Sequence, residues 1–336
     1  MRRHVRLHIA LLLGLAVLAV SACTGSSEEL VIYSGRGQNL IGPLLEQFHE
    51  QTGVDIAVRY GDSADLALLL AQEGQATPAD VFLAQNPGAV AFVGDQGLLA
   101  ELPSELLERV PARFRSNSNR WVGLSGRQRV VVYNRDLVDE SDLPDSVFDL
   151  TEPSYRGRVA VAPPNGSFHD FVSAMRLVHG DDETLAWLEG LVANDVRTYP
   201  NNNAIVDAVS RGEVEMGLVN HYYNVRFLEE DPDLPSRNHR LPDGDIGALV
   251  IPSSISVLAS SGRREAAERL VAFLLSQQAQ EYFREATFEY PLTSGVTPVE
   301  GLPSLDSLET PDVDTDALGD ELERTVELIE RSGLSN

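Results

Sequence analysis

The 336-residue chain contains no lysine, a single cysteine and no apolar run long enough to span a bilayer comfortably. All 26 basic side chains are therefore arginines, and 51 acidic side chains give the chain a formal net charge of -25. So negative a chain repels phosphate backbones and anionic lipid headgroups, and we expect no nucleic-acid partner. Because Cys23 is the only cysteine, no disulfide can form within the chain.

The N-terminal residues have the three regions of a bacterial secretory signal. Three arginines precede an apolar run over 7–20, and small residues then lead to Cys23. A cysteine directly after small residues is similar to the lipobox of bacterial lipoproteins. We therefore predict a signal peptide over 1–22 and a lipidated tether over 23–29. The protein is expected on the extracytoplasmic face of a cell membrane, with the lipid anchor as its only membrane contact.

After the tether, strand-like and helix-like segments alternate, which is typical of an α/β protein. The length favours two domains, and the first segments form a βαβαβ unit with short connections. The expected strands cover 30–33, 55–59, 79–84, 130–133, 159–162, 214–219 and 248–259. The expected helices cover 40–51, 64–73, 168–179, 182–192, 204–210, 263–284 and 319–331.

The sequence motifs of three common enzyme classes are incomplete or absent in this chain. The loop 35–37 lies between a strand and a helix like a dinucleotide-binding loop, but Leu40 occupies the third glycine position. The stretch 123–126 is similar to a nucleophile elbow, but Arg127 stands where the last glycine belongs. The seven histidines form no HExxH motif and have no cysteine partners, so zinc chemistry has no ligand set. We therefore expect that the protein is not an enzyme.

Two adjacent tyrosines, Tyr222 and Tyr223, directly follow an apolar strand. Neighbouring side chains of a strand point to opposite faces, so both phenols reach one point only if the backbone turns there. Gly217 and Asn224 permit such a turn. A phenolate is a hard anionic donor that suits ferric iron, and binding displaces a proton from each phenol. The alternative is one packed ring and one exposed ring without a metal.

Seven short blocks follow one another in the order found in a known family. They are VIYSGR (31–36), PADVF (78–82), WVGLSGRQRVVVY (121–133), NGSF (165–168), NHYY (220–223), GALV (247–250) and EYPL (289–292). In these blocks the chain resembles the ferric-iron substrate-binding proteins of bacterial ABC importers, the ferric-binding protein family. The resemblance implies a type II periplasmic-binding-protein fold, in which two crossing strands join two α/β lobes around a ligand cleft.

The resemblance also implies the domain organisation and the partners. Lobe 1 is expected to contain 30–128 and 252–303, and lobe 2 is expected to contain 129–251, with the C-terminal segment 304–336 packing on lobe 2. Proteins of this kind release their ligand when the lobes open. The expected partners are therefore the permease and ATPase of an ABC importer, and the protein itself is expected to be a monomer.

The resemblance places ferric iron on Tyr222 and Tyr223, where an exogenous anion such as carbonate or phosphate completes the coordination sphere. The residues implied to hold the anion are Asn86, Asn165, Gly166, Ser167, Asn202 and Asn220, with Arg127 nearby to lend charge. Elementary physical chemistry agrees for the stretch 165–167, because free N–H groups at the start of a helix attract anions.

The chain departs from its relatives at three ligand positions. Gly37 and Gln85 stand where some relatives have a histidine and a glutamate, and Phe168 stands where another branch has a third tyrosine. Anions or water must therefore fill more of the coordination sphere, which predicts weaker iron retention or dependence on a particular anion. The amide oxygen of Gln85 is a poor ferric ligand, and His221 is expected to point outward.

Two other functions stay open from the sequence. The same fold, with its asparagine, serine, glycine and arginine donors, has the chemistry to bind a free oxyanion or a small organic phosphate without iron. An extracytoplasmic enzyme would depend on His169 with Asp170, or on Ser125. Without an elbow, a zinc motif or a carboxylate dyad, the enzyme has the least support.

Overall fold

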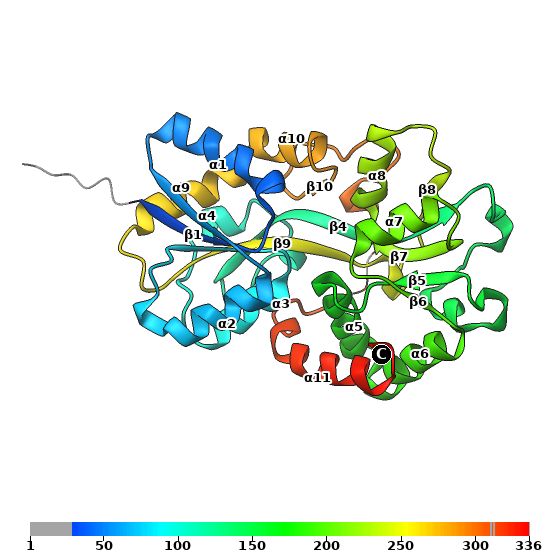
Figure 1. The fold of residues 1–336 in the computed structure, drawn as a ribbon. Helices are drawn as coiled ribbons and strands as arrows, with labels where there is room; N and C mark the ends of the chain where they lie inside the picture. Colours follow the sequence, from blue (N-terminus) through cyan, green and yellow to red (C-terminus); the bar gives the residue numbers. More distant parts are fainter. Residues whose placement is uncertain (1–28, 310, 312, 336) are drawn as a thin grey trace, which may run out of the picture.

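The computed structural model describes residues 29–309, 311 and 313–335, and these residues form two α/β lobes on one continuous mixed sheet (Figure 1). The predicted signal peptide and Cys23 lie outside the described residues. Within the described part of the chain, every helix is too short or too polar to cross a bilayer.

The sheet contains parallel strands at both ends and antiparallel strands in the middle. The strands are β1 (Leu30–Ser34), β2 (Ile56–Tyr60), β3 (Val81–Ala84), β4 (Trp121–Asn134), β5 (Val159–Val161), β6 (Arg197–Thr198), β7 (Met216–Asn220), β8 (Ser236–His239), β9 (Val250–Val257) and β10 (Tyr290–Pro291). Their order is β2-β1-β3-β9-β4-β7-β5-β6, and β8 and β10 also pair with β4. The pairs β1–β2, β1–β3, β5–β6 and β5–β7 are parallel, as the alternating strands and helices predict.

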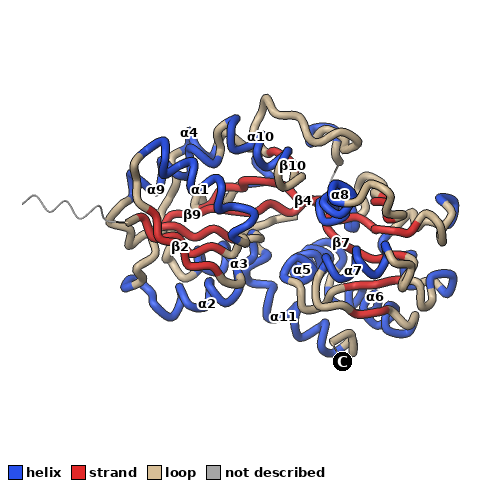
Figure 2. Tube along the Cα trace, turned by 45° about the horizontal axis from the view of Figure 1, so that its top comes forward, coloured by secondary structure: helices blue, strands red, loops and turns tan. Residues whose placement is uncertain are grey.

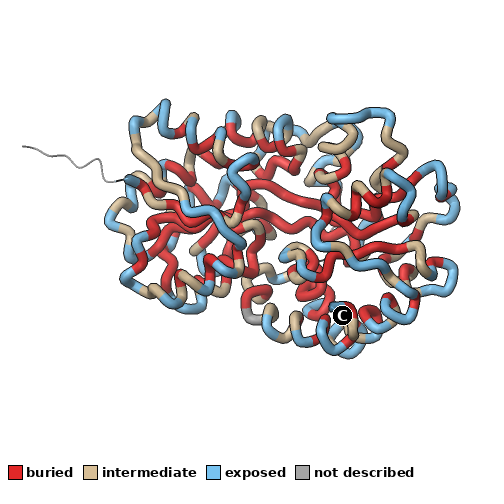
Figure 3. The backbone as a smooth tube through the Cα atoms, in the orientation of Figure 1, coloured by how far each residue is buried: buried red, intermediate tan, exposed pale blue. Residues whose placement is uncertain are grey.

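Strands β4 and β9 run between the two lobes (Figure 2). They pair antiparallel with each other, and β9 then continues alongside β3 while β4 continues alongside β7 and β8. Every residue of both strands is buried, as Figure 3 shows. Pro252 cannot donate a backbone hydrogen bond, and it lies opposite Gly126 of β4, before the register with β3 begins at Ser254.

Helices cover both faces of the sheet in each lobe. They are α1 (Gln38–Thr52), α2 (Ser63–Glu73), α3 (Pro87–Asp95), α4 (Ser104–Leu107), α5 (Gly166–His179), α6 (Asp181–Ala193), α7 (Asn202–Ser210), α8 (His221–Glu230), α9 (Arg264–Leu274), α10 (Gln277–Glu285) and α11 (Leu318–Arg331). In lobe 1, α1, α4, α9 and α10 pack on one face, whereas α2 and α3 pack on the other. In lobe 2, α5, α6 and α11 cover one face and α7 the other. Alternate strand residues supply the two cores of each lobe.

The prediction of one helix over 263–284 is wrong, because two helices occupy this stretch. Ser276 has an extended backbone, and its hydroxyl accepts a hydrogen bond from the N–H of Ala279. This interaction caps the start of α10, so the chain turns between α9 and α10 although the apolar pattern continues through the break.

The C-terminal helix α11 contacts both lobes, whereas the sequence analysis expected it on lobe 2. Leu328 and Ile329 join the core of lobe 2. At the other end of the helix, Gly319 packs so closely on α3 of lobe 1 that a Cβ there would lie 2.6 Å from the backbone nitrogen of Phe92. Helix α11 therefore packs against both lobes on one side of the molecule (Figure 1).

Candidate metal centre

A cleft of about 310 Å³ lies between the lobes. Its lining residues are Gly35, Gly61, Asp62, Ser63, Ala64, Gln85, Asn86 and Ala89 of lobe 1, Arg127 of β4, Asn165, Gly166, Ser167, His169, Asn220 and Tyr223 of lobe 2, and Leu322 of α11. The carboxyl ends of β1, β2, β3, β5 and β7 all lead into this lining, as is usual for ligand sites on open α/β sheets. A larger groove over α1 and β2 contains none of the predicted ligands.

Tyr222 and Tyr223 lie in the first turn of α8, directly after β7. The start of the helix is the backbone turn that the sequence required, whereas Gly217 remains within β7 and makes no turn. The two rings lie on the same side of the backbone and stack, with their centroids 4.2 Å apart and an interplanar angle of 28°. Tyr223 lines the cleft, whereas Tyr222 is buried and is stacked on it.

The environment of Tyr222 keeps its phenol protonated when no cation is bound. Burial raises the pKa of Tyr222 well above 10, the charges of Tyr223 and Glu289 raise it further, and only Arg127 lowers it. A trivalent cation bound to the two phenol oxygens would reverse this balance, because its charge stabilises a phenolate. Among the described residues, no cluster of three or more His, Cys, Asp or Glu side chains is arranged to hold a metal.

The predicted anion-binding residues of lobe 2 form one cluster at the start of α5. The side-chain oxygen of Asn165 accepts hydrogen bonds from the N–H of Ser167 at 3.1 Å and from its hydroxyl at 2.5 Å. The amide nitrogen of Asn202 donates to the same oxygen at 3.5 Å. Gly166 faces open space, and Asn220 lies at the end of the neighbouring strand β7. The structure therefore brings these five residues together.

Arg129 is a residue of this cluster that the sequence analysis did not identify. Its Nη1 donates to the hydroxyl of Ser167 at 3.3 Å and to the side-chain oxygen of Asn220 at 3.1 Å. Burial lowers the pKa of Arg129 to about 9, so its guanidinium remains charged at neutral pH. The sequence does contain a signal that Arg129 belongs near Arg127. The two arginines are two residues apart on β4, so their side chains point to the same face of the sheet.

Asn86 contacts Asp170 across the cleft. Its amide nitrogen donates to one carboxyl oxygen of Asp170 at 2.6 Å, and the other oxygen is buried with no hydrogen-bond partner among the described residues. Burial raises the pKa of Asp170 to about 7, although the bond from Asn86 and the charges of two arginines act to lower it. No hydrogen bond between described residues joins His169 to Asp170, so the two do not form a base with its orienting acid.

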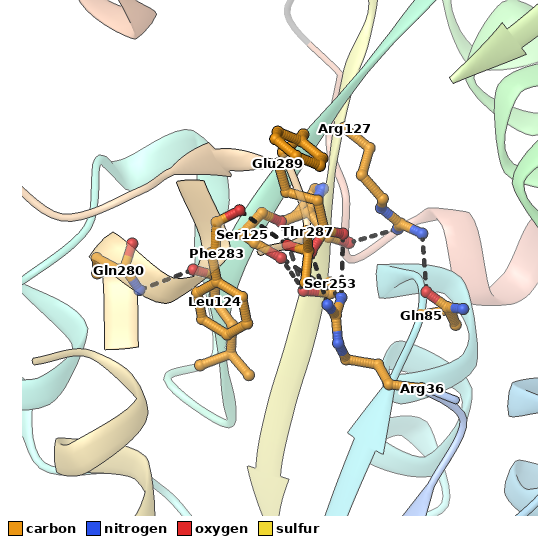
Figure 4. Close-up of polar contacts among 12 residues, drawn as sticks. Arg36, Gln85, Leu124, Ser125, Arg127, Ser253, Gln280, Phe283, Thr287 and Glu289 are labelled. Carbon is orange, nitrogen blue, oxygen red and sulfur yellow. Dashed lines mark hydrogen bonds and ion pairs between the residues drawn. The ribbon is translucent and has the colours of Figure 1, made fainter. Parts of the chain in front are cut away.

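Gln85 and Arg127 contact each other at the lobe 1 side of the cleft (Figure 4). Nη1 of Arg127 donates to the side-chain oxygen of Gln85 at 3.2 Å, and Nη2 donates to the carbonyl of Pro252 at 3.2 Å. The oxygen that the sequence analysis considered as a weak metal ligand therefore already accepts a hydrogen bond from a cation.

Arg36 of the loop after β1 forms a buried ion pair with Glu289, which precedes β10 (Figure 4). Its Nη2 lies 2.6 Å from one carboxylate oxygen, and Thr287 donates to the same oxygen at 2.8 Å. Although burial acts to raise the pKa of Glu289, the facing guanidinium brings it below its ordinary value. Ser125 is buried beside this pair and bonds to Ser253, so it presents no nucleophile to the cleft.

His221 points away from the cleft lining, but its ring is buried rather than exposed. Its Nδ1 accepts a hydrogen bond from the N–H of Gln128 at 3.0 Å, and its Nε2 lies 2.8 Å from the carbonyl of Phe288. Burial lowers the pKa of His221 to about 4, so the ring is neutral and Nε2 is the donor. Both nitrogens have partners, which leaves neither of them for a metal.

A family model described as bacterial extracellular solute-binding protein matches residues 76–315. The chain belongs to this family. It is 33% identical over 332 residues to the Fe(3+)-binding periplasmic protein of Serratia marcescens, with 97% of each chain covered. It is 31% identical over 327 residues to the major ferric iron-binding protein of Neisseria meningitidis serogroup B, covering 95% of this chain and 97% of the relative.

Solved structures agree with the fold that the sequence predicted. Iron-bound HitA from Pseudomonas aeruginosa superposes with a TM-score of 0.86 at 33% identity, covering 91% of this chain and 99% of HitA. The Trichodesmium protein IdiA (FutA), in complex with iron and citrate ligands, superposes with a TM-score of 0.80 at 26% identity, covering 91% of this chain and 99% of that one. The type II periplasmic-binding-protein fold and the resemblance are therefore confirmed.

Proposed function

We propose that this protein binds ferric iron through the phenolate oxygens of Tyr222 and Tyr223 and delivers it to the permease and ATPase of a bacterial ABC importer. The observation that carries the proposal is the stacking of two adjacent phenol rings beside a cleft rich in hydrogen-bond donors. The names of the relatives from Serratia and Neisseria support the choice of ferric iron. The chain belongs to a solute-binding family and not to an enzyme family.

In this function ferric iron is the cargo, and each phenol gives up its proton as the metal binds. Affinity then falls on acidification, because protons compete with iron for both phenolate oxygens. An anion such as carbonate or phosphate occupies the start of α5, where Asn165, Gly166 and Ser167 line the cleft. Asn86, Asn202, Asn220 and Arg127 are the further anion-binding residues that we propose.

We also propose that Cys23 carries a lipid after removal of residues 1–22. The order of basic, apolar and small residues before Cys23 supports this placement. The anchor would keep a monomeric protein at the extracytoplasmic face of the membrane, within reach of the permease, while residues 23–29 serve as the tether.

A ferric titration tests the proposed function. Adding a ferric chelate to the purified protein should produce a visible phenolate-to-iron charge-transfer band. The Tyr222→Phe, Tyr223→Phe double variant should lose the band, whereas Tyr60→Phe, at an exposed tyrosine outside the cleft, should keep it. A wild-type protein that shows no band at any anion concentration refutes the proposal.

A second candidate function is the binding of a free oxyanion or small organic phosphate without iron. Arg127 favours it, because this arginine lines the cleft and its Nε has no hydrogen-bond partner among the described residues. Calorimetry on metal-free protein separates the two functions. Tight phosphate binding that iron leaves unchanged would support the free anion as the cargo, and phosphate binding that appears only with iron would support ferric transport.

A further inference from the structure

The helical turn that carries the two tyrosines has no side-chain cap. Helix α8 begins at His221, and the side chain of the preceding Asn220 makes no capping hydrogen bond. The first N–H groups of an α-helix have no partner within the helix, so an uncapped first turn is weakly held by its own bonds. Because Tyr222 and Tyr223 belong to this turn, other contacts must fix their position.

The side chain of His221 supplies two such contacts. Its Nδ1 lies 3.0 Å from the backbone nitrogen of Gln128, and its Nε2 lies 2.8 Å from the carbonyl oxygen of Phe288. A backbone N–H can only donate and a carbonyl can only accept, so the neutral ring carries its single proton on Nε2. The ring is buried, and each of its nitrogens has a fixed role.

The two partners of His221 lie outside the body of lobe 2. Gln128 belongs to the part of β4 that pairs with β9, where these strands run between the lobes. Phe288 belongs to lobe 1, because it directly precedes the ion-paired Glu289 and β10, whose Tyr290 is part of the lobe 1 core. His221 therefore joins the start of α8 both to a crossing strand and to lobe 1.

The backbone of Phe288 is strained at the point where it meets His221. Its φ angle is 59°, in the left-handed region. The other non-glycine residues with positive φ in the described part of the chain are Asn119 and Asp195, which are residue types that tolerate this region. A bulky residue keeps such a conformation only where its surroundings hold it, and such residues are typical of functional segments. Here the strained residue provides the carbonyl that accepts from His221.

Ring packing continues the contact from lobe 1 to the tyrosine pair. The ring of His221 lies 5.2 Å from that of Tyr290 at an angle of 57°, and 6.1 Å from that of Tyr222 at 81°. Tyr222 in turn stacks on Tyr223. The hydroxyl of Tyr290 donates to the side-chain oxygen of Gln128 at 3.3 Å, which links the two partners' segments as well. A shift of His221 would therefore displace the phenol beside it.

We infer that His221 is a positioning residue for ferric iron. Its two hydrogen bonds fix the first turn of α8, and with it both phenols, to the crossing strand β4 and to lobe 1. The inference rests on the proposed function, because Tyr222 and Tyr223 are taken as the metal ligands. Both ring nitrogens are used within the protein, so His221 acts without coordinating iron. Loss of the bond to Phe288 then shortens iron retention although both phenols remain.

Two conservative variants separate the two hydrogen bonds. The side-chain NH₂ group of glutamine lies near the position of Nε2, so His221→Gln still donates to Phe288 but has no acceptor for Gln128. The side-chain oxygen of asparagine lies near the position of Nδ1, so His221→Asn still accepts from Gln128 but loses the bond to lobe 1. Each variant leaves one backbone group without a partner, and both should lower the melting temperature to a similar extent.

Release of ferric iron to a competing chelator, followed through the charge-transfer band, measures the positioning effect. We expect His221→Asn to release iron about tenfold faster than the wild type, and His221→Gln to stay within about twofold of it, since loss of a buried hydrogen bond has effects of this size. His239→Asn is the matched control, because Nε2 of His239 also lies 2.8 Å from a carbonyl, that of Pro144, but within lobe 2. It should release iron at the wild-type rate.

A measurement on the wild type tests the geometry even if the variants do not fold. Nitrogen NMR of the histidine rings in the metal-free protein should show a neutral His221 with its proton on Nε2. That proton should exchange slowly with solvent, because the ring is buried. A proton on Nδ1, or rapid exchange, would exclude the bond to Phe288 and overturn the inference.

The outcomes distinguish this inference from the proposed function. If the wild type forms no charge-transfer band with any anion, the proposed function fails and the inference fails with it. If the band forms but His221→Asn and His221→Gln release iron at equal rates, the bond to lobe 1 has no positioning role. The inference is then overturned while ferric binding stands.

Discussion

The stability of the metal-free protein should depend on pH through the buried Asp170. This side chain is 2% exposed, receives one hydrogen bond from Asn86, and has a second oxygen without a partner among the described residues. Burial raises the pKa of Asp170 from 3.8 to about 7. The perturbation that tests this environment is Asp170→Asn, which keeps an oxygen for Asn86 but cannot ionise.

The sign of the effect follows from proton binding. Between about pH 4 and pH 7 the folded protein keeps the proton of Asp170 while the unfolded chain has lost it. The free energy of unfolding of the wild type therefore falls across this range, relative to Asp170→Asn, and stays at the lower level above pH 7. The interval from 3.8 to about 7, at about 1.4 kcal/mol per pH unit, corresponds to a relative loss of about 4 kcal/mol.

Chemical denaturation at several pH values between 4 and 8 measures this difference. We expect the free energy of unfolding of Asp170→Asn to increase steadily relative to that of the wild type as the pH rises. Asp182→Asn, at an exposed aspartate of α6, is the control and should follow the wild-type curve. Parallel curves for wild type and Asp170→Asn would show that Asp170 ionises as it does in water, and would refute the reasoning from burial.

Two further predictions concern the packing of the lobes. Glu289→Gln leaves Arg36 buried without its carboxylate and should lower the free energy of unfolding by about 3–5 kcal/mol. Denaturant titration measures this change. A loss below about 1 kcal/mol would contradict the prediction. Gly319→Ala places a Cβ 2.6 Å from the backbone nitrogen of Phe92 and should cost about 1–3 kcal/mol in the same assay. Gly262→Ala is the control, because a Cβ there meets no atom within 4 Å, and it should leave the free energy of unfolding nearly unchanged. Equal losses of stability for Gly319→Ala and Gly262→Ala would argue against close packing of α11 on α3.

Apolar periodicity was enough to locate most elements of lobe 1. The spacing at 40, 41, 44, 45 and 48 predicts α1, and these are its buried residues. Helix α3 was missed because its sequence PGAVAFVGD has almost no polar face from which to read a period. Helix α8 was missed because it starts directly at the end of β7, and Asn220 provides no side-chain cap to mark the start.

The candidate site, too, is only partly predictable from the sequence. Adjacent tyrosines are visible in the sequence, and the structure shows that their rings stack. The different roles of the buried arginines are not visible, because they depend on distant residues. Arg36 meets Glu289 from 253 residues away, whereas Arg129 meets two neutral groups, Ser167 and Asn220, from 38 and 91 residues away. Whether an arginine has a carboxylate partner is thus a property of the tertiary fold.

The distribution of the site between the lobes determines what opening of the cleft does. Tyr222, Tyr223 and the start of α5 all belong to lobe 2, and Arg129 lies on the part of β4 that pairs with β7. Lobe 1 contributes Gln85 and the contact of Asn86 with Asp170. Separation of the lobes would therefore uncover the proposed iron and anion without removing the two phenolates. Release then requires a second event on lobe 2, either protonation of the tyrosines or departure of the anion.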